Sequence, residues 1–93
     1  MADRIYRAPG DGALRIEALG AVTAIFDRRS MQTHLVVAPM PEILVELAAG
    51  PCDAATLAAR LADRFDMEGE GDAAAIIADR LGELAAMGLV EPA

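Results

Sequence analysis

Histidine and cysteine, two residue types that often carry out catalysis or bind metals, each occur once in this chain. The histidine is His34 and the cysteine is Cys52. His34 has no cysteine or carboxylate at the spacing of a metal site or a catalytic triad, and Cys52 follows a proline in a turn with no base nearby to activate it. Isolated residues of this kind are usually packing or surface residues. We therefore predict no catalytic residue, no metal site and no cofactor, and expect that the protein is not an enzyme.

An acidic segment also has residues that suit a binding site, but not their spacing. Glu68, Glu70 and Asp72 alternate with Gly69 and Gly71. A calcium loop places its ligands at other intervals. A phosphate-binding loop needs a strand before the glycines and a lysine after them, and this chain contains no lysine. The segment is predicted to be a flexible acidic loop.

The overall composition is that of one acidic, alanine-rich domain. The 93 residues are 55% hydrophobic and carry a net charge of −7, which favours a folded chain with a modest core over a disordered one. Phosphate neutralisation supplies most of the non-specific affinity for nucleic acid. The acidic balance therefore argues against a nucleic-acid partner and favours basic or neutral partners.

The chain shows no sequence signal for export or membrane insertion. The start, from Met1 to Arg4, has no apolar stretch of the kind found in signal peptides. The longest apolar run is interrupted by Pro39, Pro41 and Glu42 and is too short to cross a bilayer. We expect a cytoplasmic protein without a membrane partner.

Alternating hydrophobicity predicts three strands in the first part of the chain. Residues 1–12 are predicted to be irregular, although Ile5 and Tyr6 can add a short edge segment. From residue 13 the apolar residues alternate with polar ones, which predicts a half-buried strand. Further strands are predicted over 22–26 and 32–37, and the short polar turns between them favour an antiparallel meander. In the last of these strands, alternation predicts one face formed by Thr33, Leu35 and Val37 and the other by His34 and Val36.

Helical spacing dominates the rest of the chain. Pro41 suits a helix start and Gly50 a helix end. Asp53 is predicted to cap a second helix, and Asp72 a third that runs to about Met87; residues 89–90 then form a short closing strand or tail. The predicted fold class is therefore α+β and winged helix-turn-helix-like, with a three-stranded antiparallel sheet followed by three helices. The predicted core positions of the helices are Ile43, Leu44, Leu47, Leu57, Leu61, Phe65, Ile77, Leu81, Leu84 and Ala85.

The third predicted helix has a wider apolar arc than one packing face requires. On a helical wheel, Ile76, Arg80 and Met87 lie beside the core positions and not opposite them. These side chains either pack beneath a loop or form the wall of a groove. If the third strand is a free edge beside this helix, an incoming peptide can pair with it as an added strand and contact Ile76 and Met87.

A diffuse pattern over residues 13–90 resembles the PqqD-like peptide chaperones, the recognition elements of ribosomally made and modified peptides, and most closely the branch associated with HPr-kinase-related proteins. The first twelve residues lie outside the resemblance. It depends on apolar spacing and a Thr-His-Leu strand, not on a catalytic signature. The residues that carry it are Asp27, Thr33-His34-Leu35, Pro39, Glu42-Ile43-Leu44, Leu47, Gly50, Leu57, Leu61, Phe65 and Gly88-Leu89-Val90.

The resemblance implies a non-catalytic protein that holds the leader of a precursor peptide and presents it to a modifying enzyme. The partners it implies are the leader peptide and a modifying enzyme or HPr-kinase-related protein. Pro39 and Pro41 depart from the family pattern and are expected to stiffen or shorten the strand edge. The implied peptide-binding residues are Thr33, Leu35, Val37, Ile76, Ile77, Arg80 and Leu84, to which the wheel adds Met87.

Other functions remain open at this point. A winged-helix DNA-binding regulator is the main alternative, but Asp79 and Glu83 on the third helix would repel phosphates, and the arginines are scattered. A structural subunit that docks permanently on an enzyme is a third reading. An exposed sheet edge can also pair with a second copy of the chain to form a homodimer.

Overall fold

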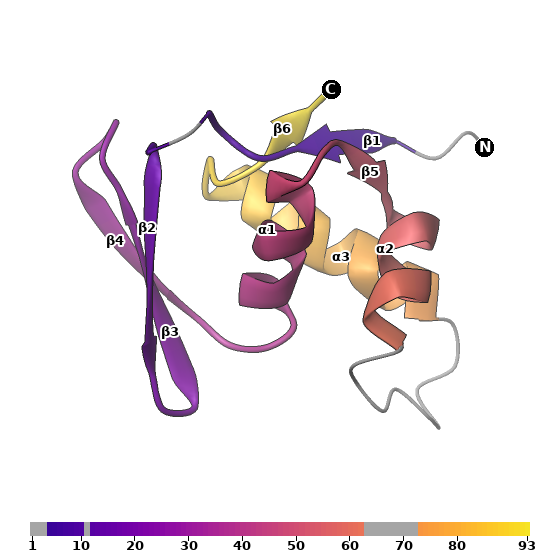
Figure 1. The fold of residues 1–93 in the computed structure, drawn as a ribbon, viewed down its shortest axis with the longest axis horizontal. Helices are drawn as coiled ribbons and strands as arrows, with labels where there is room; N and C mark the ends of the chain where they lie inside the picture. The colour runs from indigo at the N-terminus through magenta and orange to yellow at the C-terminus, as the bar shows by residue number, and fades with distance from the viewer. Residues whose placement is uncertain (1–3, 11, 63–72) are drawn as a thin grey trace.

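The protein is an α+β fold with three helices and two small antiparallel sheets (Figure 1). The computed structural model describes residues 4–10, 12–62 and 73–93, and the counts of elements refer to these residues. Within these ranges, no helix has the length and apolar character needed to cross a membrane. The elements in chain order are β1 (Ile5–Arg7), β2 (Leu14–Leu19), β3 (Val22–Asp27), β4 (Gln32–Val36), α1 (Met40–Ala48), β5 (Cys52–Asp53), α2 (Ala54–Ala62), α3 (Ala73–Ala86) and β6 (Glu91–Pro92).

The larger sheet is the antiparallel meander that the alternating pattern predicts. Its strand order is β2-β3-β4, so β2 and β4 are both edge strands. Ile25 in the centre of β3 pairs with Ile16 on one side and with His34 on the other. These three side chains share the face toward the helices, and Ile25 is fully buried there. Figure 1 shows the helices on one side of this sheet only.

The smaller sheet corrects the prediction that residues 1–12 are irregular. Strand β1 lies between β5 and β6 and pairs antiparallel with both. The observed order therefore interleaves strands and helices, and is not a single sheet followed by three helices. The predicted closing strand at residues 89–90 is displaced in the structure: β6 consists of Glu91 and Pro92, whereas Leu89 and Val90 are buried in the core. Strands of two or three residues are too short to show an alternating pattern, so sequence periodicity does not reveal them.

The helix ends agree with the capping signals. Asp53 caps α2, since its Oδ1 accepts a hydrogen bond of 2.8 Å from the backbone N–H of Thr56. At the end of α3, Gly88 adopts a φ of 77°, which glycine tolerates without steric cost. The N–H of Leu89 then bonds to the carbonyl of Leu84 at 2.9 Å and that of Gly88 to Ala85 at 3.0 Å. These two bonds form a Schellman motif that terminates the helix.

One apolar core joins the larger sheet to all three helices. Leu57, Leu61, Ile77, Leu81 and Leu84 are fully buried, as their helical spacing predicts. The predictions for Phe65, for the acidic loop and for the Asp72 cap lie outside the described residues.

Candidate functional site

Strand β4 offers unpaired backbone groups along its outer edge. The N–H of Arg28 donates to the carbonyl of Ala13 at 2.9 Å, which fixes the even-numbered residues of β3 as those bonded to β2. The backbone groups of an antiparallel strand alternate in direction, so the odd-numbered residues of β3 bond to β4. Their partners on β4 are Gln32, His34 and Val36. The N–H and C=O groups of Thr33 and Leu35 therefore point to the free edge.

The side chains of the predicted strand residues point away from the helices. Leu35 is 67% exposed and Val37 is 55% exposed, and Thr33 is also exposed. Leu35 pairs with Ala24 and Thr33 with Phe26 across the outer face of the sheet. Alternation correctly predicted that these three residues share a face opposite His34 and Val36. At this edge, Thr33 and Leu35 can contribute backbone hydrogen bonds, whereas the side chains facing the helices are those of His34, which is partly exposed, and Val36, which is buried.

Two of the predicted helix residues belong to the core. Ile77 and Leu84 are 0% exposed, so a ligand cannot reach them without rearrangement. Ile76, Arg80 and Met87 are partly buried on one flank of α3. This flank keeps some surface accessible, and it is the part of the predicted wall that a ligand can contact.

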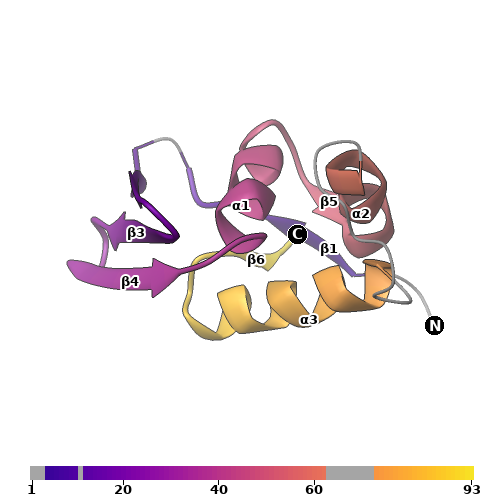
Figure 2. The ribbon, with the colours of Figure 1, turned by 90° about the horizontal axis from the view of Figure 1, so that it is seen from below.

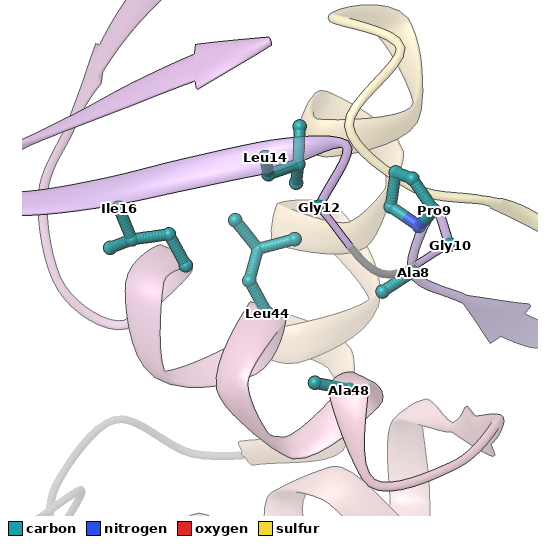
Figure 3. Close-up of a pocket in the computed structure, with 8 residues that line it drawn as sticks. All are labelled: Ala8, Pro9, Gly10, Gly12, Leu14, Ile16, Leu44 and Ala48. Atoms are coloured by element: carbon teal, nitrogen blue, oxygen red, sulfur yellow. The ribbon is translucent and has the colours of Figure 1, made fainter. Parts of the chain in front are cut away.

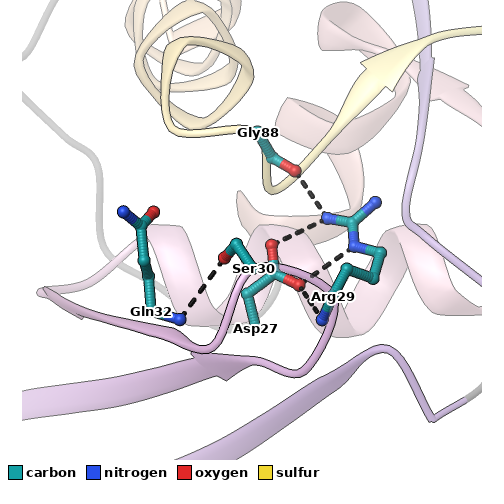
Figure 4. Close-up of polar contacts among 5 residues, drawn as sticks. All are labelled: Asp27, Arg29, Ser30, Gln32 and Gly88. Atoms are coloured by element: carbon teal, nitrogen blue, oxygen red, sulfur yellow. Dashed lines mark hydrogen bonds and ion pairs between the residues drawn. The ribbon is translucent and has the colours of Figure 1, made fainter.

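The position of β4 relative to α3 is fixed by an ion pair at the β3–β4 turn (Figure 4). Asp27, the last residue of β3, is only 4% exposed. Its carboxylate accepts hydrogen bonds from Nε and Nη2 of Arg29, both at 3.0 Å, and from the Arg29 backbone N–H at 2.9 Å. Nη2 of Arg29 also donates to the Gly88 carbonyl at 2.8 Å. The guanidinium thus joins the sheet to the terminus of α3, and we call these three residues the turn clamp.

The clamp changes the acidity of both charged groups. The hydrogen bonds from the Arg29 side chain lower the pKa of Asp27, although burial acts in the opposite direction. The same contact raises the pKa of Arg29. Both groups are therefore charged at neutral pH. Local sequence patterns predict a polar turn after β3 but not the bond from Arg29 to Gly88, because these two residues are 59 positions apart in the chain.

The clamp sets β4 beside the C-terminal part of α3. Figure 2 shows β3, β4 and α3 in this order from top to bottom, with β4 on the side of the sheet that faces α3. Two polar atoms on these elements, Nε2 of His34 and Nε of Arg80, are buried without a hydrogen-bond partner. Buried polar atoms are rarely left unpaired. Nη2 of Arg80 does have a partner, a carboxylate oxygen of Glu83 at 2.7 Å.

At the other edge of the sheet, between β2 and α1, lies an apolar hollow that the sequence did not predict (Figure 3). Its volume is about 140 Å³. Leu14 and Ile16 of β2 and Leu44 of α1 point into it, and Ala8, Pro9, Gly10 and Gly12 line one end. The side chains that line it are all apolar, and backbone groups supply the polar part of its surface, so the hollow suits a hydrophobic side chain.

The single cysteine, Cys52, lies in the smaller sheet beside an arginine. Cys52 is buried in β5, and Nη1 of Arg60 lies 3.2 Å from its sulfur. The same Nη1 lies 3.8 Å from Glu46. Among the residues that the structure describes, no group of three or more histidine, cysteine, aspartate or glutamate side chains is placed to hold a metal ion. No protein-family description, curated protein or solved structure matches the chain.

Proposed function

We propose that the protein is a non-catalytic peptide-binding chaperone that takes an extended segment as an added strand on β4. The observation that carries this proposal is the free edge of β4 at Thr33 and Leu35, held beside α3 by the turn clamp. Strand addition supplies affinity through backbone hydrogen bonds, and adjacent side chains supply selectivity. The five residues of β4 would pair with a peptide segment of about the same length, roughly 16 Å when extended.

The chemistry of the flank of α3 suits this role. In the proposed complex, alternate side chains of the peptide lie between His34 and the flank formed by Ile76, Arg80 and Met87. Nε2 of His34 and Nε of Arg80 are buried without a partner; a shift of these two side chains on binding would expose both atoms to peptide groups and remove the cost of leaving them unpaired. Ile76 and Met87 would contact apolar peptide side chains. The remaining peptide side chains lie on the outer face of the sheet, beside Leu35.

The resemblance to PqqD-like chaperones leads to a specific form of the proposal. In this form the domain is winged-helix-like and the peptide is the leader of a ribosomally made precursor. The partner is the enzyme that modifies this precursor, or an HPr-kinase-related protein. The fold is compatible with such a role because the edge strand β4 precedes a bundle of three helices.

Charge argues against the DNA-binding alternative. The chain carries a net charge of −7, and Asp79 and Glu83 are exposed on α3. Arg80, the basic residue of that helix, is paired with Glu83. A reading helix with this charge would be repelled by phosphates.

The test is a peptide selection followed by titration. A displayed library of random peptides of about twelve residues, longer than β4, supplies the probe. The selected peptide is titrated into ¹⁵N-labelled protein, and we expect the largest shift changes at Thr33–Val36 and on the flank of α3. Shift changes confined to other elements, or a selection that yields no binder, would contradict the proposal.

Two substitutions on α3 separate binding from folding. Ile76→Asp is expected to weaken peptide binding by about 1–3 kcal/mol, the value of burying an apolar side chain, with little change in the melting temperature. Leu81→Asp places a charge in the fully buried core and is expected to unfold the domain. Unchanged binding by Ile76→Asp would move the binding surface away from this flank.

A further inference from the structure

The second edge strand of the larger sheet, β2, also has unpaired backbone groups. Because the Ala13 carbonyl accepts from β3, the odd-numbered residues of β2 bond to β3. The N–H and C=O groups of Leu14, Ile16 and Ala18 therefore point to the free edge. Nearly the whole strand is exposed, as expected for an edge without a neighbour.

Apolar surface lies directly beside this edge. Ile16 is 42% exposed although it lines the hollow between β2 and α1. On α1, Ala48 lines the same hollow, and Val45, which is 53% exposed, lies one helical turn from Ala48. A partner that pairs with β2 would cover both the edge and this apolar strip.

The charged side chains of β2 are arranged so that they can pair with those of a second copy of the same strand. Arg15 and Glu17 flank Ile16 on the outer face and lie 3.5 Å apart. If a second copy pairs antiparallel with Ile16 opposite Ile16 of the partner subunit, Arg15 lies opposite Glu17 of the partner subunit. Two-fold symmetry produces this pair twice. The same register sets Leu14 opposite Ala18 of the partner subunit, so the residues with free backbone groups meet one another.

We propose that β2 is a homodimer interface, in which two copies join their sheets edge to edge. Backbone hydrogen bonds form at Leu14, Ile16 and Ala18, and the outer face gains two opposite-charge pairs between strands. The Ile16 side chains of the two copies meet at the mouths of the hollows, close to Val45. Strand β4 remains free at each end of the joined sheet, so this inference does not depend on the proposed peptide binding.

The test is the oligomeric state of the full chain and of charge-reversal variants, measured by sedimentation equilibrium. A salt concentration of about 0.15 M screens the repulsion between two acidic chains. We expect wild type to shift from monomer to dimer as the protein is concentrated toward about 1 mM, since small interfaces are weak. R15E and E17R each convert both interstrand pairs into like-charge pairs. Each is expected to raise the dimer dissociation constant at least about tenfold, and the double variant R15E/E17R is expected to restore it.

The double variant R15E/E17R tests whether the order of the charges, and not a loss of folding, controls dimerisation. Arg15 and Glu17 are exposed, so the substitutions are expected to leave the fold intact, which circular dichroism checks. D79R makes the same change in charge as E17R on the exposed side of α3, and is expected to leave the dimer unchanged. A wild type that stays monomeric, single variants that dimerise as wild type does, or a double variant that stays monomeric would each overturn the interface. None of these outcomes affects the test of peptide binding on β4.

Discussion

The two edges of the larger sheet differ in charge and in what lies beside them. Strand β4 has no charged side chain, exposes Thr33 and Leu35, and is tied to α3 through the turn clamp. Strand β2 carries Arg15 and Glu17 on its outer face and borders an apolar hollow against α1. Charged residues on an edge strand discourage pairing with arbitrary chains.

This difference indicates two kinds of partner. An uncharged edge accepts extended segments of varied sequence, because the backbone supplies most of the interaction. An edge with an ordered pair of opposite charges selects a partner with the reverse order, and a second antiparallel copy provides it.

Breaking the turn clamp should affect the β4 edge and spare the β2 edge. Arg29→Ala leaves the buried Asp27 carboxylate without its charged partner and frees the Gly88 carbonyl. We expect a loss of about 2–3 kcal/mol in unfolding free energy, typical of charged hydrogen bonds, together with weaker peptide binding. Urea unfolding and peptide titration measure the two effects. Arg28→Ala, at an exposed neighbouring position, is the control, and equal effects of both substitutions would exclude the clamp as the cause.

Proline substitutions should separate the two edges. Leu35→Pro removes an N–H that points to the free edge of β4 without breaking a bond to β3. We expect the peptide dissociation constant to rise at least about tenfold, which is about 1.4 kcal/mol, while the dimer is unaffected. Ile16→Pro should have the reverse effect.

Titration calorimetry and sedimentation of both proline variants provide the measurement. Leu35→Ala keeps the N–H and should bind peptide more tightly than Leu35→Pro. If both proline variants lose the same activity, the two edges do not have separate partners.

Acid should weaken the clamp within a defined pH range. The pKa of Asp27 is lower in the folded protein than in the unfolded chain, where it is about 3.9. The clamp's contribution to stability is therefore complete above about pH 4 and is lost as the pH falls through the folded pKa. The difference in unfolding free energy between wild type and Asp27→Asn should shrink as the pH is lowered from about 4 through the folded pKa of Asp27. A difference independent of pH would contradict the assigned shift.

The smallest effect is expected at a position that belongs to neither edge. Asp53→Ala removes the cap of α2, and the pKa of Asp53 is lowered by the hydrogen bonds from Thr56. We expect a small decrease in melting temperature and no change in either dissociation constant. A loss of peptide binding or dimerisation would show that α2 is coupled to an edge.

The sequence predicted those parts of the fold that have local signals. Alternation predicted β2, β3 and β4 and the shared direction of Thr33 and Leu35, and cap residues predicted the end of α1 and the start of α2. The smaller sheet was missed because β5 and β6 have two residues each and form only after distant segments meet. Periodicity contains no information about such pairings.

The candidate site was predicted less completely than the fold. Helical spacing separated the flank of Ile76, Arg80 and Met87 from the core positions. The resemblance, in contrast, placed Ile77 and Leu84 in the peptide site, whereas the tertiary contacts bury both residues fully. Alternation also could not show which face of the sheet the helices cover. The role of Arg29 depends on Gly88, and the hollow beside β2 depends on α1; neither leaves a local pattern in the sequence.

Strand β1 has a consequence for the order of folding. It comes early in the chain, yet it pairs with residues 52–53 and 91–92, and the N–H of Ala93 bonds to the Ile5 carbonyl at 2.7 Å. During synthesis the meander can form from neighbouring segments, whereas β1 must wait for β6 before its second side is covered. Closing so long a loop costs entropy before any contact compensates for it. The smaller sheet is therefore expected to form last, after both edge strands of the larger sheet, when β6 pairs with β1.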